Sequence, residues 1–185
     1  MKITKEIRHD LKKITETDGK VLYLYRPSLF RPLLADGEKI RPVRRLRFLY
    51  EYLHLGHYDV YYLADSGELA GYCVVTPGGR RLKCSGKRDI VLGPYYVYED
   101  MRGKGYSEIM ISAVLRNYRR DYRCAFDWIA KDNIPSIKAT KRCGFKKIGE
   151  LRVVGKMRRL VMVRENGTSV VYRYKDPGYA KKTNK

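Results

Sequence analysis

Apolar residues along the chain form short runs and stripes that predict several strands and a few helices. Gly93-Pro94 predicts a bend within one run, and Asp65-Ser66-Gly67 predicts a hairpin between two others. The runs typical of strands are Val21–Tyr25, Tyr58–Leu63, Leu69–Thr76, Ile90–Tyr98 and Cys124–Ala130.

Helical spacing occurs in four segments. A stripe near the N-terminus contains Ile3, Ile7, Leu11 and Ile14, and a second helix is expected from Pro42 to Gly56. The third helix is expected from about Gly105 to Tyr118. The fourth is bounded by two local signals, because Asn133 can cap its start and Gly144 suits the position after its last turn.

The C-terminal part of the chain is β-like after Phe145. Asn166-Gly167 between Arg159–Arg164 and Ser169–Tyr174 predicts that these two runs pair as a hairpin. The element order indicates an α/β or α+β fold, with a mixed, mostly antiparallel sheet flanked by helices. We expect a single domain over residues 1–175, followed by a polar basic tail over residues 176–185.

Composition adds a charge that needs an explanation. Of the 185 residues, 44% are apolar, which permits a packed core, and 40 Lys and Arg against 20 Asp and Glu leave a net charge of +20. This excess suggests an anionic partner. The basic clusters are scattered along the sequence and do not form one block, so nucleic acid is not a favoured partner. A polyphosphate cofactor, an acidic substrate or simple solubility would also explain the charge.

Other features narrow the class of protein. No apolar run is long enough to span a membrane, and the N-terminus Met1–Lys5 lacks the apolar stretch of a signal peptide, so we expect a cytoplasmic protein without a membrane partner. We expect it to be a monomer or a homodimer. The cysteines at 73, 84, 124 and 143 form no CxxC pair and stand apart from the histidines at 9, 54 and 57. No metal site is therefore expected.

The strongest candidate site is the glycine-rich run Arg102-Gly103-Lys104-Gly105-Tyr106-Ser107, which lies between a strand and a helix. Glycines allow backbone N–H groups at a helix start to converge on one anion, which is typical of phosphate binding. The run has neither the spacing of a Walker loop nor that of a dinucleotide fingerprint. A tight turn with no ligand is the structural alternative.

This run resembles the R/Q-x-x-G-x-G/A signature of the GNAT superfamily of acyl-CoA-dependent N-acetyltransferases. Downstream, Asn133-Ile134-Pro135-Ser136-Ile137 and Cys143-Gly144-Phe145 are similar to the family's asparagine and its helix-terminal Gly-Phe. The resemblance covers residues 69–150 and implies an acyl-CoA N-acyltransferase fold. It also implies acetyl-CoA, or another acyl-CoA, as the co-substrate.

The resemblance assigns roles to individual residues. Backbone amides from Gly103 to Ser107 would hold the CoA pyrophosphate, and Arg102 and Lys104 would add positive charge. Val97 and Asn133 would contact the pantetheine arm. The full set of expected cofactor-binding residues is Val97, Arg102, Gly103, Lys104, Gly105, Tyr106, Ser107 and Asn133.

Two residues depart from the family pattern. Ser107 replaces the last glycine or alanine of the signature, and Thr140 stands where many relatives have a tyrosine beside the CoA sulfur. The proton donor to the sulfur therefore stays open among Cys143, another tyrosine and water.

Asp127 is the candidate proton acceptor, because it interrupts the apolar strand Cys124–Ala130 and burial there would raise its pKa. A structural salt bridge is the alternative role for this carboxylate. Asp89, Glu99 and Asp100 are weaker candidates.

These observations favour an enzyme that transfers an acyl group, most simply acetyl, from acyl-CoA to a primary amine. The acceptor is unidentified, and the positive charge of the chain suggests that it is anionic. Two other functions stay open. One is a nucleic-acid-binding module, for which Tyr172-Arg173-Tyr174-Lys175 offers aromatic and basic side chains on a strand. The other is a domain that binds acyl-CoA without turnover, which Thr140 favours.

Overall fold

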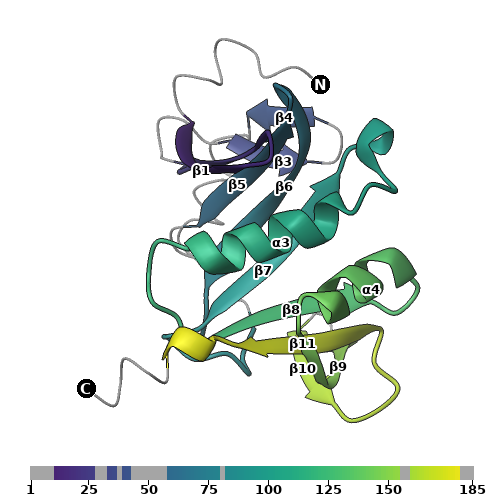
Figure 1. Ribbon diagram of the computed structural model, residues 1–185. Coiled ribbons are helices and arrows are strands. Elements are labelled where there is room, and N and C mark those ends of the chain that lie inside the picture. The colour runs from purple at the N-terminus through teal and green to yellow at the C-terminus, as the bar shows by residue number, and fades with distance from the viewer. Residues whose placement is uncertain are drawn as a thin grey trace. The chain divides into compact units, whose positions relative to one another are not determined.

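The computed structural model describes residues 11–27, 33–36, 39–42, 58–79, 82–154 and 159–179. These residues belong to two compact units, and Figure 1 shows the elements of each. The first unit comprises residues 1–76 and 94–118, and the second comprises residues 77–93 and 119–185. The strand β7 (Ile90–Val97) is divided between them, because its residues up to Gly93 belong to the second unit.

The first unit is a set of hydrogen-bonded strands with one long helix. Its strand order is β1-β2-β5-β6, with the second half of β7 next to β6. The turns Asp18-Gly19 and Ser66-Gly67 have positive φ at both residues, the conformation that two-residue hairpins require. The elements are β1 (Lys12–Thr17), β2 (Lys20–Tyr25), β3 (Leu33–Asp36), β4 (Lys39–Pro42), β5 (Asp59–Asp65), β6 (Glu68–Pro77), the 3-10 helix η1 (Glu99–Met101) and α3 (Tyr106–Asn117).

Tyrosine rings dominate one side of these strands. Tyr62 and Tyr72 pack with ring centroids 6.4 Å apart, and Tyr98 meets Tyr96 edge to face at 5.7 Å. Tyr61 belongs to the opposite side of β5, where its ring lies 6.3 Å from that of Tyr118 just beyond α3. Strand alternation thus gives β5 one face for the tyrosine cluster and one for α3.

The second unit has the strand order β7-β8-β11-β9-β10, with α4 (Ile134–Arg142) beside β8. Its strands after β7 are β8 (Cys124–Ala130), β9 (Lys146–Val154), β10 (Arg159–Val163) and β11 (Ser169–Lys175). The pairing of β7 with β8 is parallel, at Ile90 with Ala125 and at Val91 with Phe126, whereas the pairings among β8, β11, β9 and β10 are antiparallel. The predicted fold class, a mixed and mostly antiparallel sheet with helices, is confirmed.

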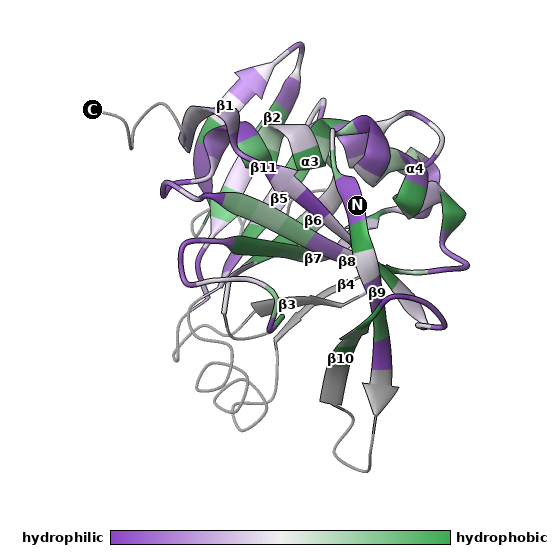
Figure 2. Ribbon diagram, turned by 90° about the horizontal axis from the view of Figure 1, so that it is seen from below, coloured by the Kyte–Doolittle hydropathy of each residue, from purple (hydrophilic) through white to green (hydrophobic). Residues whose placement is uncertain are grey.

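Hydrophobic residues concentrate on the strands. Figure 2 colours long stretches of β6 and β7 green, and Val75 and Val91 on these strands are fully buried. The second unit has its own apolar cluster, in which the loop residue Leu82 packs with residues of four strands. Its buried members are Leu82, Val91, Cys124, Phe126, Leu151 and Val171.

Most predicted strands and the last two helices are confirmed, including the bend at Gly93, whose φ is 105°. The predicted N-terminal helix is wrong for residues 12–17, which form β1. β-branched side chains favour this strand, and the Asp18-Gly19 turn returns the chain to β2. Residues 1–10 of that stripe lie outside the described residues. Pro42 ends β4, and the rest of the helix expected from it lies outside the described residues as well.

The hairpin predicted around Asn166-Gly167 is wrong as a pairing, although Asn166 does adopt the expected positive φ of 60°. Strand β9 lies between β10 and β11 and pairs with both. The chain after the turn joins β9, since Thr168 N–H donates to Leu151 O at 2.8 Å. A Cβ on Gly167 would lie only 2.7 Å from that same carbonyl oxygen, so this close approach requires glycine.

Candidate functional site

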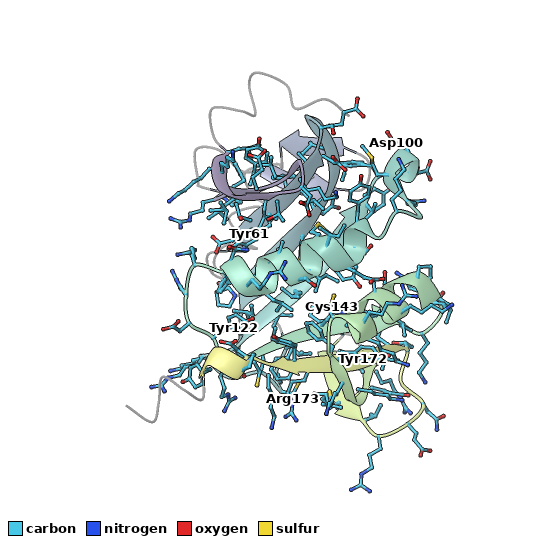
Figure 3. All side chains as sticks on the ribbon, viewed as in Figure 1. Tyr61, Asp100, Tyr122, Cys143, Tyr172 and Arg173 are labelled. Atoms are coloured by element: carbon cyan, nitrogen blue, oxygen red, sulfur yellow. The ribbon has the colours of Figure 1, made fainter. Side chains whose placement is uncertain are left out.

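The glycine-rich run forms the turn between η1 and α3 in the first unit, where Figure 3 labels Asp100. Gly103 and Gly105 adopt φ values of 79° and 77°, in the left-handed region that favours glycine. Among the described residues, a Cβ at either position would meet no atom within 4 Å. The two glycines therefore serve the backbone conformation, and the space beside them is open.

Gly105 is also the N-cap of α3, and within the described chain no side chain caps the helix there. Glu108 N–H and Ile109 N–H both donate to Gly105 O, which starts the helical hydrogen-bond series. The earlier N–H groups of a helix have no partner inside the helix and carry the positive end of its dipole. Lys104 is exposed beside them. This arrangement suits an anionic group such as a phosphate.

The side chain of Tyr106 is used in a structural contact and does not serve to bind an anion. Its hydroxyl donates a hydrogen bond to Asp65 Oδ2 at the β5–β6 turn, and its side chain is buried. This hydrogen bond lowers the pKa of Asp65 and raises the pKa of Tyr106. Tyr106 thus anchors the first turn of α3 to a hairpin, which leaves its backbone amide as the group that can face a ligand.

Arg102 fastens the start of the loop to the end of β7. Its Nε donates to Val97 O at 3.2 Å, its Nη2 donates to the Tyr96 hydroxyl at 2.8 Å, and its Nη1 donates to Glu99 Oε1 at 3.1 Å. The guanidinium also lies 5.2 Å from the centre of the Tyr96 ring. Arg102 therefore already donates to the carbonyl of Val97, a residue whose backbone the family resemblance assigned to the pantetheine arm.

In the second unit, Asp127 is buried in β8, with 2% of its surface exposed. Thr140 of α4, which is fully buried, donates from Oγ1 to Asp127 Oδ2 at 3.0 Å. A Cβ added at Gly93 would lie 3.7 Å from Asp127 Oδ1, so the second carboxylate oxygen faces the bend of β7. Thr140 is the partner of this carboxylate that the sequence did not identify.

Tyr172 lies opposite Asp127 on β11 and is labelled in Figure 3. Its pKa is raised, first by burial and also by the charge of Asp127, while Lys147 opposes the rise. A buried carboxylate, a threonine and a tyrosine thus share one region of the second unit.

Asn133 caps α4 as predicted, since its Oδ1 accepts a hydrogen bond from Ser136 N–H at 3.3 Å. Cys143 is the C-cap residue of the same helix and is partly buried, and Gly144 follows it with a φ of 86°. Asn133 is exposed, and its amide NH2 group is the part of the side chain that can still contact a ligand.

Two of the three weaker acid candidates, Asp89 and Glu99, are engaged elsewhere, and Asp100 is exposed. Both oxygens of Asp89 accept from Arg123, at 3.1 Å from Nε and 2.9 Å from Nη2, and Gly86 N–H donates to Oδ2 at 2.6 Å. Glu99 pairs with Arg102. Asp89 is therefore an anchor for the loop that precedes β7, and Asp127 is the better candidate for chemistry.

The sequence model of the Acetyltransferase (GNAT) family matches residues 23–145. A search of curated proteins finds no match. Among solved structures, the chain is similar to yncA of Salmonella typhimurium with acetyl-CoA, at 20% identity over 74% of this chain and 77% of that one, with a TM-score of 0.51. It is similar to RimL, a ribosomal L7/L12 alpha-N-protein acetyltransferase in complex with coenzyme A, at 14% identity over 89% and 98%, with a TM-score of 0.55. The spermidine/spermine N-acetyltransferase SpeG from Vibrio cholerae is 11% identical over 88% and 98%, with a TM-score of 0.56. These likenesses show the fold.

Two further findings concern the described residues alone. They contain no helix that is long and apolar enough to cross a membrane. They also contain no group of three or more His, Cys, Asp or Glu side chains that could hold a metal ion.

Proposed function

Because the chain belongs to the GNAT acetyltransferase family, we propose that it transfers an acetyl group from acetyl-CoA to a primary amine of an anionic acceptor. The observation that carries this proposal is the loop at the start of α3. Gly103 and Gly105 hold left-handed conformations there, beside open space and an N-terminus that no described side chain caps.

The loop fits the pyrophosphate of CoA on three counts. The backbone amides from Gly103 to Ser107 lie at the positive end of α3, Lys104 is exposed, and nothing described fills the space where two phosphates need to approach closely. For Arg102 we propose a more indirect role. Arg102 already donates to Val97 O, so it competes with an N–H group of the pantetheine arm of CoA for that carbonyl. The pantetheine arm would then pair with β7 only when Arg102 releases this carbonyl.

When bound, acetyl-CoA supplies a thioester whose carbonyl carbon the amine nitrogen attacks. The carbon–nitrogen bond forms, the carbon–sulfur bond breaks, and the nitrogen loses one proton while the sulfur takes one up. We propose Asp127 as the acceptor of the amine proton, because it is a buried carboxylate with one oxygen fixed by Thr140. The hydroxyl hydrogen of Thr140 is donated to Asp127, so Thr140 is a poor proton donor to the sulfur, and that donor stays open among Cys143, a tyrosine and water.

The acceptor class follows from the charge. A net charge of +20 is far more than the roughly four negative charges of CoA require, even with charge-assisted bonds to several phosphate oxygens. A positive surface raises the local concentration of an anionic acceptor and speeds its encounter with the enzyme. We therefore propose an acceptor with a free amine and a net negative charge.

The test is release of CoA thiol from acetyl-CoA with a panel of amines that share one chain length and differ in charge. The expected result is turnover with anionic amines and little with neutral or cationic ones. Turnover that prefers cationic amines would overturn the acceptor class. A rise in Tm with CoA but no thiol release from any amine would favour the second candidate, a domain that binds acyl-CoA without turnover, which the engaged Thr140 hydroxyl supports.

A further inference from the structure

A pocket opens in the first unit between α3 and the strands β1 and β2. α3 packs on β5, while β2 and β1 continue the sheet to one side of the helix (Figure 1). The space between the flank of α3 and these two strands has a volume of about 700 Å³. This volume is within the roughly 300–1,000 Å³ that is usual for small-molecule sites. None of the residues assigned to acetyl transfer lines this pocket.

The floor of the pocket is apolar. Leu22 of β2 lies opposite Leu63 of β5, and both side chains are buried. Thr15 of β1 lies opposite Leu22, so it borders the same face of the sheet. From the helix, Ile109 and Ala113 line the pocket together, because residues four positions apart share one flank of a helix. The floor can therefore take the apolar part of a ligand out of water.

Two opposite charges in the wall of the pocket make no ion pair within the described part of the chain. Asp18 is exposed at the β1–β2 turn, and Arg116 is exposed in the last turn of α3. Glu108 and Ser112 line the wall as well, but each is engaged in another interaction. The carboxylate of Asp18 and the guanidinium of Arg116 are thus the charges that a ligand can meet.

The two charges are separated along the pocket. Ser66 N–H donates to Gly19 O at 3.4 Å, so the turn that carries Asp18 meets the β5–β6 turn. The Tyr106 hydroxyl fastens the first turn of α3 to this same corner. Arg116 is ten residues after Tyr106, about 15 Å further along the helix axis. This separation explains why Asp18 and Arg116 do not pair with each other.

Neutral polar groups line the stretch between the charges. Thr15 and Thr17 of β1 both face the pocket, as alternate residues of a strand do. Asn117 donates through Nδ2 to a carbonyl of its own helix at 2.8 Å, which leaves its Oδ1 as an acceptor. Lys20 also lines the pocket near the turn, where Asp65 Oδ2, 3.9 Å from its Nζ, offsets its charge. Hydroxyl and amide groups of this kind match the N–H and C=O groups of a peptide.

We propose that a short zwitterionic peptide binds in this pocket, with its free ammonium at Asp18 and its free carboxylate at Arg116. An extended chain advances about 3.3 Å per residue, so four residues span about 13 Å and the two charged side chains reach the remainder. An apolar side chain in the middle would lie on Leu22 and Ala113. A single amino acid is too short to reach both charges. A polyphosphate would meet the like charge of Asp18, and a simple amine would leave Arg116 without a partner.

Binding is measured by calorimetry on the full-length protein without acetyl-CoA, with the tetrapeptide Ala-Leu-Leu-Ala as the probe. We expect saturable binding at one site per chain. Acetylation of the peptide's N-terminus or amidation of its C-terminus should each weaken binding about tenfold or more, because each removes one charged contact. Equal affinities of the three peptides, or no saturable binding up to about 10 mM, would overturn the proposal.

Substitutions test the two ends separately. Asp18→Asn should weaken binding of the free peptide about tenfold and leave binding of the acetylated peptide unchanged, and asparagine tolerates the φ of 49° at this position. Arg116→Gln should show the same pattern with the amidated peptide. The matched control is Lys12→Gln with Lys13→Gln, two exposed lysines of β1 that do not line the pocket, which should leave all affinities unchanged. Losses that do not depend on which terminus is blocked would contradict the assigned orientation and overturn the proposal.

The space itself is tested by Ala113→Leu, which fills the pocket without changing its charge and should abolish peptide binding. Circular dichroism checks the fold of each variant, and if Ala113→Leu does not fold, the two substitutions at exposed sites decide the outcome. The pocket shares no residue with the glycine-rich loop, so this proposal and the acetyl-transfer proposal fail separately. Gly105→Asp should lose CoA binding and keep peptide binding, whereas Arg116→Gln should do the reverse.

Discussion

Thr140 and Asp127 form a buried pair, in which the threonine hydroxyl donates to one carboxylate oxygen at 3.0 Å from across the interface of α4 and β8. A hydrogen bond to a charged group is worth more than a neutral one, and removing one buried partner leaves the other unsatisfied. The pair therefore fixes the orientation of Asp127. Thr140, at the position where the family resemblance led us to expect a tyrosine, thus holds a carboxylate.

Asp127→Asn is expected to lower kcat about 100-fold or more, the usual contribution of a positioned general base, with little change in the KM for acetyl-CoA. Asparagine keeps the shape and can still accept from Thr140 through its carbonyl oxygen, so the fold should survive. Thr140→Ser, which keeps the hydroxyl, serves as the control and should retain most activity. A kcat for Asp127→Asn within a factor of about two of the wild type would remove Asp127 from catalysis.

Gly105→Asp is expected to abolish CoA binding measured by calorimetry. The aspartate would set a negative charge where the pyrophosphate is proposed to lie, and it would strain a left-handed position by about 1–2 kcal/mol. Gly19→Asp is the matched control, since Gly19 has a φ of 72°, open surroundings and the same unit. Gly105→Asn separates charge from strain. Unchanged CoA affinity in folded Gly105→Asp would rule out the loop as the phosphate site.

The sequence predicted those parts of the site that depend on local conformation. The Gly103 and Gly105 turn, the Asn133 cap and the Gly144 stop each depend on residues within one turn of the chain, and all three adopt the expected conformation. The Asp127 carboxylate was visible as a polar residue in an apolar strand. Its partner Thr140 was not, because thirteen residues separate them and only the packing of α4 brings them together.

The errors in the fold also concern non-local pairing. Asn166-Gly167 did form a turn, but a turn signal cannot tell that β9, from earlier in the chain, pairs with both flanking strands. Near the N-terminus, the helical spacing of apolar residues through Ile14 led to a helix prediction. The Asp18-Gly19 pair just after it is a hairpin marker that would have predicted the two strands correctly.

Asn133→Ala is expected to lower the free energy of unfolding by about 1 kcal/mol through loss of the cap on α4. If the side chain also contacts the pantetheine arm, CoA affinity falls in the same variant. Asn133→Ser distinguishes the two roles, because serine restores the cap and lacks the amide NH2 group. Wild-type CoA affinity in both variants would leave Asn133 with the capping role alone.

Glu150 should make the protein sensitive to acid. Lys131 and Lys147 each bond one of its oxygens, at 2.7 and 2.9 Å, and Gly167 N–H donates to it as well, which lowers its pKa from 4.5 to about 2. A depressed pKa in the folded state means that its contribution is complete above pH 4.5 and is lost as the pH falls towards 2. Glu150→Gln should therefore flatten the dependence of Tm on pH in this window, while Glu165→Gln, an exposed residue of the same unit, should not. Parallel Tm profiles of Glu150→Gln and wild type would contradict this assignment.

The last prediction concerns salt. If the positive surface steers an anionic acceptor, kcat/KM for that acceptor should fall steeply as ionic strength rises, because the screening length is about 10 Å at 0.1 M salt. The KM for acetyl-CoA should change less, since its phosphates would be held at close range by backbone amides. Lys83→Gln with Lys87→Gln, two exposed residues of the loop before β7, should lower kcat/KM at low salt and make it less dependent on salt. Lys12→Gln with Lys13→Gln is again the control, as it removes the same charge from the first unit. A neutral amine that the enzyme accepts provides the reference, because steering cannot act on it. Should kcat/KM for the anionic acceptor stay level from low to high salt, the charge serves another purpose and the acceptor need not be anionic.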